Sequence, residues 1–317
     1  MAEWLYEAGI GEARAALVSR GTIWKARIEP ETGGPRAGAI VRARLAERAT
    51  GRVTLDDRLG DALCDPLPKG VTQGGAFLVR IVREAIRERG RPKLPKAVPA
   101  GAEGVPAPGP DLLARITATG LPVRHLRAHE PDLLEEAGWS EVLEEARTGE
   151  IAFDGGALRL ALTPAMALFD VDGSGPIEPL AIAAAQAVAR AMERLEITGS
   201  VGIDFPTLAG KAARIAVGEA IDATLPQPFE RTAVNGFGFL QVVRRRERPS
   251  LPELLAADPA GADARAELRR LERLSPPVPP THMVSRAVAQ RLAAEPGWTA
   301  ELARRTGGTR AFVTSGD

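Results

Sequence analysis

Two apolar segments of strand length each end in an acidic residue, and a helical segment joins them. Residues 165–169 run directly into Asp170, and residues 199–203 run directly into Asp204. Between them, residues 178–196 are rich in alanine and have helical periodicity. Neighbouring parallel strands need a crossover of this kind, and open α/β sheets place ligands at the C-terminal ends of their strands. The pattern therefore predicts that Asp170 and Asp204 meet at one edge of a parallel sheet.

The chemistry of such a pair points to a divalent metal. A hard cation such as magnesium prefers oxygen ligands, and one or two carboxylates together with a substrate phosphate hold it. Asp172 follows Asp170 by two residues, so in a continued strand it shares the same face. Three carboxylates converging there would repel one another without a cation between them. We therefore predict a metal site at Asp170 and Asp204 with Asp172 beside it. The structural alternative is that these residues cap turns at the strand ends.

Length and cysteine content narrow the class of protein. A chain of 317 residues suits one large or two modest domains. Cys64 is the only cysteine, which excludes an internal disulfide and a Cys-cluster zinc site within one chain and fits a reducing cytosol. The start of the chain lacks a signal-peptide pattern, and no apolar run reaches the roughly 18 residues of a membrane span. These features predict a cytoplasmic protein without a membrane partner.

A basic segment follows a group of short predicted strands at residues 38–47, 51–55 and 76–83. Between residues 80 and 96 the chain carries seven basic and two acidic side chains, although its overall net charge is zero. One interpretation is a solvated charged edge. The other is a surface that binds RNA phosphates by releasing counterions, because OB-type barrels commonly carry such grooves. The candidate RNA-binding residues in this segment are Arg80, Arg83, Arg87, Arg89, Arg91 and Lys93.

The remaining elements follow from turn signals and periodicity. β-Hairpins are predicted at residues 13–28 and 149–161, where Arg20-Gly21 and Asp154-Gly155 supply the turns. Strands are also predicted on both sides of Asn235-Gly236. Amphipathic periodicity predicts helices at residues 208–223, 251–274 and 281–293.

Five segments of the chain, taken together, carry a family pattern. Residues 155–174 combine a Gly-Gly hairpin, an apolar strand and an Asp-Val-Asp-Gly-Ser turn, and residues 198–205 end an apolar strand in Asp-Phe. Residues 235–246 contain Phe-Gly-Phe-Leu-Gln and end in three arginines. In this order they resemble the ribonuclease E/G family. Residues 12–18 are similar to its N-terminal strand and residues 79–84 to the end of its OB-fold barrel, so the resemblance spans most of the chain.

The resemblance implies a mixed α/β fold. It implies an RNase H-like and DNase I-like catalytic core, an inserted small OB-fold-like β barrel that binds RNA, and a small α/β C-terminal tail. The expected divisions are the N-terminal hairpin of the RNase H-like core at 1–34, the barrel at 35–96, the linker and helical part of the RNase H-like core at 97–148, the DNase I-like catalytic domain at 149–248 and the C-terminal α/β region at 249–317.

The resemblance also implies a function. Members of this family are magnesium-dependent endoribonucleases that hydrolyse phosphodiester bonds of single-stranded RNA, in the processing or decay of rRNA and mRNA, and leave a 5′-phosphate and a 3′-hydroxyl. Asp170 and Asp204 match the two aspartates that hold one magnesium ion, for which manganese could substitute. Arg244 and Arg246 match two family arginines, which near the metal would neutralise RNA phosphates. Asp172 would assist or modulate catalysis.

Three departures from the family pattern leave a second function open. Asp172 stands where the family has Asn, and an ionised Asp cannot donate a hydrogen bond to a phosphate. Asp172 therefore either joins the metal shell or slows or abolishes cleavage. The insert that senses a 5′-monophosphate and the Cys-x-x-Cys zinc link are both missing. No structural zinc is expected, and monomer and dimer both stay open. The alternative function is a catalytically degenerate RNA-binding protein of the same family.

Overall fold

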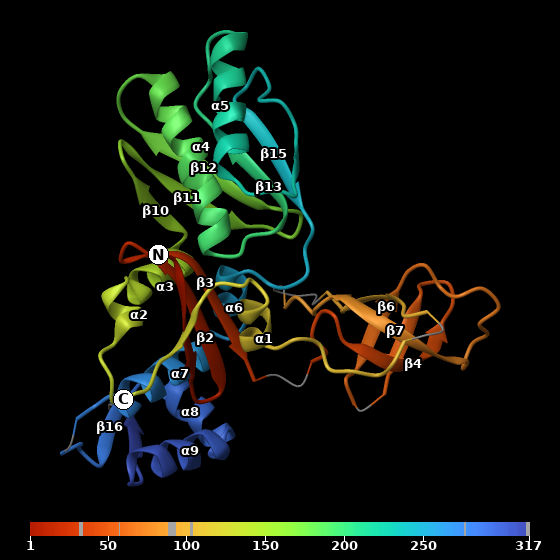
Figure 1. The fold of residues 1–317 in the computed structure, drawn as a ribbon, viewed down its shortest axis with the longest axis vertical. Helices are drawn as coiled ribbons and strands as arrows, with labels where there is room; N and C mark the ends of the chain where they lie inside the picture. The colour runs from red at the N-terminus through yellow and green to blue at the C-terminus, as the bar shows by residue number, and fades with distance from the viewer. Residues whose placement is uncertain (32–33, 57, 88–92, 102–103, 276, 315–317) are drawn as a thin grey trace. The chain divides into compact units, whose positions relative to one another are not determined.

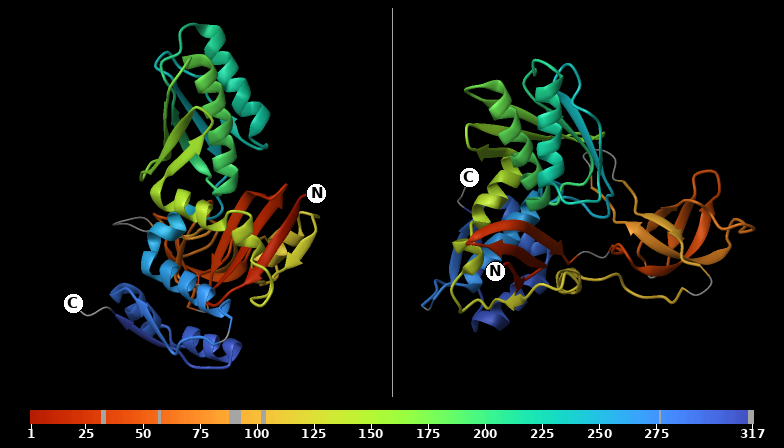
Figure 2. Two further views of the ribbon diagram at one scale, coloured as in Figure 1. Left: turned by 90° about the vertical axis from the view of Figure 1, so that its left-hand side faces the viewer. Right: turned by 45° about the horizontal axis from the view of Figure 1, so that its top comes forward.

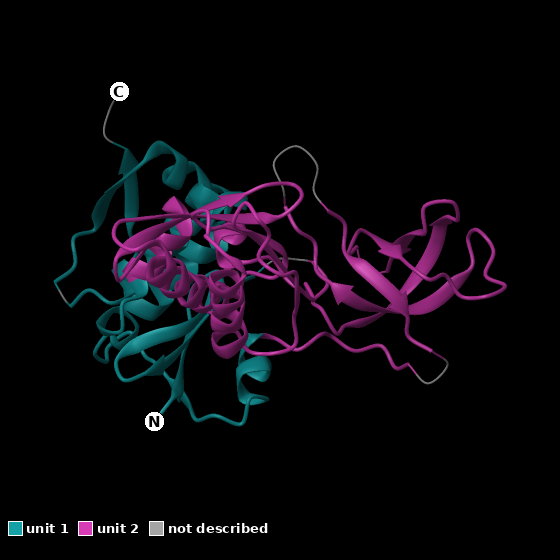
Figure 3. Cartoon of the chain, turned by 90° about the horizontal axis from the view of Figure 1, so that it is seen from above, with its two compact units in different colours: residues 1–32, 112–139, 255–317 teal, residues 33–111, 140–254 magenta. Residues whose placement is uncertain are grey.

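The chain divides into two compact units, which are described separately. This is a computed structural model, and it describes residues 1–31, 34–56, 58–87, 93–101, 104–275 and 277–314. Unit 1 comprises residues 1–32, 112–139 and 255–317, and unit 2 comprises residues 33–111 and 140–254 (Figures 1 and 3). The fold is mixed α and β in both units. Each unit is therefore assembled from segments that are far apart in the sequence.

Unit 1 is built on a four-stranded sheet in the order β3-β2-β1-β9. Its strands are β1 (Glu3–Ala8), β2 (Glu12–Ser19), β3 (Thr22–Pro30) and β9 (Val123–His125). β1, β2 and β3 are antiparallel, and β9 pairs with β1 in parallel. Arg20 and Gly21 both have positive φ, at 53° and 73°, as a tight hairpin turn between β2 and β3 requires. The predicted N-terminal hairpin is thereby confirmed.

The rest of unit 1 is mainly helical. Its helices are α1 (Leu112–Thr117), α2 (Leu133–Glu136), α7 (Pro259–Glu272), α8 (Arg286–Ala294) and α9 (Pro296–Thr306), and a parallel strand pair joins β16 (Thr281–Val284) to β17 (Ala311–Thr314). The predicted single helix at 251–274 is two helices, α6 (Leu251–Ala257) and α7, which are divided at Asp258. The Asp258 side chain caps α7 by accepting a hydrogen bond from the Gly261 amide. The predicted helix at 281–293 was wrong at its start. Ser285 caps α8 through the Val288 amide, and the residues before it form β16.

A buried ionic cluster joins the sheet of unit 1 to α7. Arg14, only 1% exposed, lies with Nη1 2.7 Å from Glu7 Oε1 and Nε 2.7 Å from Glu12 Oε1. On α7, Arg265 Nε lies 2.6 Å from Glu12 Oε2, and Arg269 Nε lies 2.8 Å from Glu7 Oε1. Each carboxylate therefore bridges an arginine of the sheet and an arginine of the helix. Because buried charges are tolerated only when they are paired, these residues fix how α7 docks on the sheet.

Removing one member of this cluster should destabilise unit 1 strongly. Arg14→Ala removes the positive charge that pairs with the buried carboxylates of Glu7 and Glu12. We therefore expect a loss of about 3–5 kcal/mol in the free energy of unfolding. The matched control is Arg270→Ala on the same helix, because Arg270 pairs with Glu267 while its side chain is 53% exposed; this control should cost less than about 1 kcal/mol. Chemical denaturation followed by circular dichroism measures both. Equal effects of the two variants would show that the cluster does not hold the unit together.

The same cluster should make unit 1 sensitive to acid through Asp132. Burial raises the pKa of Asp132, but the hydrogen bond and charge of Arg269, with Arg273 close by, outweigh burial and leave the pKa below its ordinary value of 3.8. Asp132 therefore contributes stability that is complete above about pH 3.8 and is lost as the pH falls through its lower folded pKa. Asp132→Asn keeps an N-cap for α2. We expect this variant to have a lower thermal midpoint at pH 7 and the difference from the wild type to shrink towards pH 3; a constant difference would contradict the argument.

In unit 2, five strands close a small barrel in the order β4-β5-β6-β8-β7. They are β4 (Ile40–Glu47), β5 (Arg52–Leu55), β6 (Asp61–Cys64), β7 (Ala76–Arg83) and β8 (Lys96–Pro99). The strands predicted at 38–47, 51–55 and 76–83 are confirmed, whereas the sequence did not indicate β6 and β8. Cys64 is buried in the barrel core, and burial raises the pKa of its thiol to about 11. Cys64 thus fills space in the core and is not poised as a nucleophile.

The second part of unit 2 is a six-stranded sheet in the order β10-β11-β12-β13-β15-β14. Its strands are β10 (Glu150–Phe153), β11 (Gly156–Leu162), β12 (Ala167–Gly173), β13 (Gly199–Asp204), β14 (Glu230–Arg231) and β15 (Phe239–Arg244). α3 (Trp139–Thr148) leads into it. Only β12 and β13 are parallel neighbours, and the predicted crossover helix joins them as α4 (Ile177–Arg194). The hairpin predicted at 149–161 is also present.

Helices cover one face of this sheet. α4 and α5 (Lys211–Thr224) lie side by side on the same face (Figures 1 and 2). Phe169, Ile203 and Leu240 are buried there, while the residues next to them in sequence point to the opposite face. Alternation along each strand therefore assigns every side chain to the helical layer or to the open face.

In the part of the chain that the structure describes, no helix is both long and apolar enough to span a membrane.

Candidate active site

The open face of the six-stranded sheet carries a row of charged and aromatic residues, one from each of β11, β12, β13 and β15. Asp170 is the register partner of Asp204 across the parallel β12–β13 pair. Arg159 of β11 lies opposite Asp170, and Phe239 of β15 lies opposite Asp204. Directly paired residues point to the same face of a sheet, and neighbouring strands are about 4.8 Å apart. The structure therefore brings the two predicted aspartates together as neighbours. Asp204 ends β13 as predicted, whereas Asp170 lies in the middle of β12, which continues to Gly173.

The two carboxylates of this row are exposed and have no protein partner. Asp170 and Asp204 are both exposed to solvent, and among the described residues neither side chain makes a hydrogen bond or an ion pair. Because Phe169 and Ile203 are fully buried beneath them, the two strands cannot rotate to separate the carboxylates. The pair is thus held rigidly while its oxygens remain available to a ligand.

Asp172 lies on the same face, but its carboxylate pairs with the guanidinium of Arg159. Its Oδ2 lies 3.2 Å from Arg159 Nη1, and Arg159 Nε lies 3.4 Å from Glu150 Oε1. Over the described ranges, no group of three or more His, Cys, Asp or Glu side chains is placed to hold a metal. The predicted third carboxylate is therefore not gathered with Asp170 and Asp204.

The donor set at Asp170 and Asp204 nevertheless fits one kind of metal. Magnesium dehydrates reluctantly, keeps several waters, and is commonly bound through one or two carboxylates together with substrate phosphates. Two exposed, register-paired carboxylates on an open face match this requirement. A cation that needs a complete protein cage, as structural zinc does, does not fit them.

An apolar surface adjoins the acidic pair on the same face. Gly202 is the residue two before Asp204 on β13, and a Cβ atom placed on it would lie 2.7 Å from Phe239 Cζ, 3.0 Å from a Leu168 methyl carbon and 3.0 Å from Met166 Sδ. The absence of a side chain at 202 therefore allows these three apolar side chains to close over the backbone of β13. The surface they form begins next to the carboxylates.

The loop that precedes Phe239 is held by hydrogen bonds and presents a second aromatic ring, that of Phe237. Asn235 Oδ1 accepts hydrogen bonds from the amides of Phe237 at 2.9 Å and Phe239 at 3.0 Å. The Gly238 carbonyl accepts a bond of 3.2 Å from the Phe205 amide, directly after Asp204. Gly238 has φ of +92°, and a Cβ atom there would lie 2.2 Å from Phe205 O, so only glycine fits. Phe237, in the middle of this loop, is 85% exposed.

Three members of the row and its surroundings were not identified from the sequence. Strand register, which the sequence alone does not specify, places Arg159 beside Asp170 and Phe239 beside Asp204, and Phe237 lies in the loop two residues before Phe239. The only local signal was Asn235-Gly236 followed by Phe-Gly-Phe, a turn with an unusually high density of aromatic residues in a chain that has 4% of them.

The structure places Arg244 and Arg246 far from the carboxylates. Arg244 is the register partner of Gly199, at the opposite end of the β13–β15 pair from Asp204, so roughly 16 Å of strand separates them. Arg244 Nη1 lies 2.5 Å from Glu193 Oε1. Arg246 forms an ion pair with Glu253. Both arginines are therefore engaged inside the protein.

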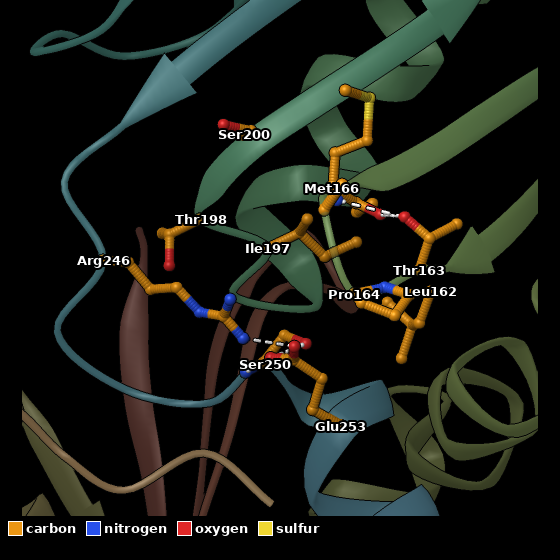
Figure 4. Close-up of a pocket in the computed structure, with 12 residues that line it drawn as sticks. Leu162, Thr163, Pro164, Met166, Ile197, Thr198, Ser200, Arg246, Ser250 and Glu253 are labelled. Carbon is orange, nitrogen blue, oxygen red and sulfur yellow. Dashed lines mark hydrogen bonds and ion pairs between the residues drawn. The ribbon is translucent and has the colours of Figure 1, made fainter. Parts of the chain in front are cut away.

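The environment of Arg246 is a small polar cavity. Figure 4 shows Arg246, Thr198, Ser250 and Glu253 around this cavity, whose volume is about 20 Å³. Glu253 also accepts hydrogen bonds from the amide and the hydroxyl of Ser250, at 2.8 and 2.9 Å. A space of this size holds about one water molecule, so the cavity cannot take an RNA phosphate. An RNA contact by either arginine stays a prediction.

The predicted basic segment begins within β7 and leads to β8 of the barrel, and the structure describes only part of it. Arg80 and Arg87 are exposed, Arg83 Nη2 donates to the Leu94 carbonyl at 2.7 Å, and Lys93 Nζ donates to the Pro164 carbonyl at 3.1 Å. Arg89 and Arg91 lie outside the described residues. RNA binding by this segment also stays a prediction.

No family model matches this chain, and no curated protein sequence matches it. The functional assignment therefore depends on the geometry of the site and on the residue pattern that led to it.

The internal role of Arg244 can be tested directly. A double-mutant cycle of Arg244→Ala and Glu193→Ala should give a coupling of about 1–2 kcal/mol in the free energy of unfolding, because both side chains are mostly buried and share a charge-assisted hydrogen bond. Arg245→Ala is the control, since the Arg245 side chain is 71% exposed and should have little effect. A coupling near zero, with loss of RNA binding instead, would assign Arg244 to the ligand.

Proposed function

We propose that this protein is a magnesium-dependent endoribonuclease that hydrolyses phosphodiester bonds of single-stranded RNA. The observation that carries the proposal is the register pairing of Asp170 and Asp204 on the open face of a rigid sheet. The resemblance of residues 155–174, 198–205 and 235–246 to the ribonuclease E/G family supports it. In this proposal the six-stranded part of unit 2 is the DNase I-like catalytic region, unit 1 is the RNase H-like region, and the barrel is the RNA-binding OB fold.

Each residue of the row has a role in this mechanism. Asp170 and Asp204 would hold magnesium, or manganese in its place, from two strands whose register is set by the core beneath them. Magnesium bound there supplies neutralisation of the phosphate charge and activation of a coordinated water. Arg159, beside Asp170, contributes a positive charge on the side of the row away from Phe239. It is shared with Asp172 and Glu150 and can turn toward a phosphate because these pairs are exposed.

A second candidate function is RNA binding without cleavage. The ion pair between Asp172 and Arg159 favours it. Asp172 stands where the family it resembles has Asn, and it draws a cation away from any phosphate near Asp170. The two functions share the RNA ligand and differ in whether magnesium leads to strand scission.

Substitution of the paired aspartates tests the proposal. The purified chain, incubated with an AU-rich single-stranded RNA, should cleave it in magnesium and not in EDTA, and the products should carry 5′-phosphates and 3′-hydroxyls. Asp170→Asn and Asp204→Asn should each lower the rate by about 100-fold or more, because loss of a partner of a metal ligand alone costs about 10–100-fold. Gel electrophoresis of end-labelled RNA measures the rate.

Two matched variants sharpen the result. Asp154→Asn, in the β10–β11 turn outside the row, should leave cleavage unchanged. Asp172→Asn introduces the residue that the ribonuclease E/G family has at this position, and it should keep or raise the rate of RNA cleavage. Cleavage that survives in the Asp170→Asn/Asp204→Asn variant would refute the proposed site. RNA that binds but is never cut in magnesium or manganese would establish the second function.

A further inference from the structure

Phe239 is paired with Asp204 of the acidic pair, and Phe237, two residues earlier in the chain, has a ring whose exposure serves no packing purpose. Phe237 is 85% exposed at the middle of a loop whose backbone is fixed by hydrogen bonds that Asn235 Oδ1 accepts and by one that the Phe205 amide donates to Gly238. A flexible loop could fold such a ring away, but this loop holds it in solvent. Presentation of a large apolar side chain on a rigid support is a feature of binding surfaces.

Phe239 complements Phe237 from the strand. Its backbone is paired with Asp204, and its ring extends over Gly202, where any Cβ atom would meet Cζ at 2.7 Å. The ring therefore rests against the backbone of β13 and is only partly covered. Phe239 thus borders the carboxylate row on its β15 side, and Phe237 precedes it by two residues in the adjoining loop.

We propose that Phe237 and Phe239 form a subsite that stacks a nucleobase of the single-stranded RNA whose phosphate lies at Asp170 and Asp204. Every base presents a π face, and stacking on aromatic side chains is the usual way in which proteins hold unpaired bases. This inference rests on the proposed function and specifies how that site recognises its substrate.

The order of residues along the row matches the parts of a nucleotide. Arg159 is cationic, Asp170 and Asp204 suit a cation-bound phosphate, and Phe239 follows on the next strand with Phe237 in the loop before it. Steps of about 4.8 Å between strands are comparable with the distance from a phosphate to its base. A second copy of this chain would be a competing occupant of an apolar surface. However, an acidic pair at its edge would face the identical acidic pair in a twofold contact, which is unfavourable.

A thermodynamic cycle between protein and RNA tests the subsite. The binding assay uses the Asp170→Asn/Asp204→Asn background, which does not cut, and a fluorescein-labelled AU-rich single-stranded RNA of about 12 nucleotides, followed by anisotropy at low salt. The same RNA is made with one abasic nucleotide at each position in turn. Phe237→Leu and Phe239→Leu are each combined with every RNA. Phe237→Tyr and Phe239→Tyr keep an aromatic ring, and Val243→Ala alters an apolar residue that is 45% exposed on the same face of β15 but away from the row.

We expect one abasic position to weaken binding by about 10-fold in the background protein, in line with the stacking energy of a single base. The same abasic position should weaken binding by less than about twofold in the Phe→Leu variants, because the ring that held the base is already missing. The Tyr variants and Val243→Ala should behave as the background does. Phe237→Leu lies at an exposed position and should fold normally, which keeps the test valid if Phe239→Leu does not.

Three outcomes would overturn the subsite. Additive losses at every abasic position would show that the rings do not contact a base, while cleavage by the wild-type chain would still support the proposed function. No binding or cleavage of RNA would overturn both proposals together. Self-association that Phe237→Leu and Val243→Ala abolish equally, with RNA affinity unchanged, would assign the surface to a second copy of the chain.

Discussion

The parallel pairing of β12 with β13 is the constraint on which the candidate site depends. A slip of one residue in this pairing would leave Asp170 beside Ile203 or Phe205 and would break the match between the two open-face side chains. What prevents the slip is the packing of Phe169 and Ile203 under α4 and α5, both fully buried. The position of the carboxylates is therefore determined by the apolar core and exists before any ligand arrives. Such preorganisation is what a site for a weakly held cation needs.

Acidic side chains are accommodated in two different ways in this protein. In unit 1, Glu7 and Glu12 are buried, and each is matched by arginines at 2.6–2.8 Å. On the open sheet of unit 2, Asp170 and Asp204 are neighbours of like charge in full contact with water. Two like charges a few ångströms apart repel by only about 1 kcal/mol in water but by far more in the protein interior. Exposure therefore allows the acidic pair to exist without a partner, and that same exposure keeps it accessible to a metal and a substrate.

The sequence predicted what local patterns determine. Period-two alternation, the Asp154-Gly155 turn and the Ala-rich crossover indicated β10 to β13 and α4, and through them the meeting of Asp170 with Asp204. It could not predict strand direction further along the chain. β15 is antiparallel to β13, so its first residue, Phe239, lies beside Asp204, while its last, Arg244, lies at the far end. Arg244 was expected near the metal because residues 235–246 resemble the ribonuclease E/G family. Long-range pairing, which the local sequence does not encode, instead put aromatic rings there and gave Arg244 to Glu193.

This difference in partners separates side chains that build the fold from those available for function. Arg244, Arg246 and Arg83 donate to groups within the protein, and removing them would expose or orphan their acceptors. Across the described residues the carboxylates of Asp170 and Asp204 have no such partner, and the ring of Phe237 is in solvent although its backbone amide donates to Asn235 Oδ1. Rigid support of groups that contribute nothing to packing lowers the entropy that a ligand must remove on binding. A site on this face is therefore indicated less by the identity of its residues than by how firmly the fold holds groups that it does not itself use.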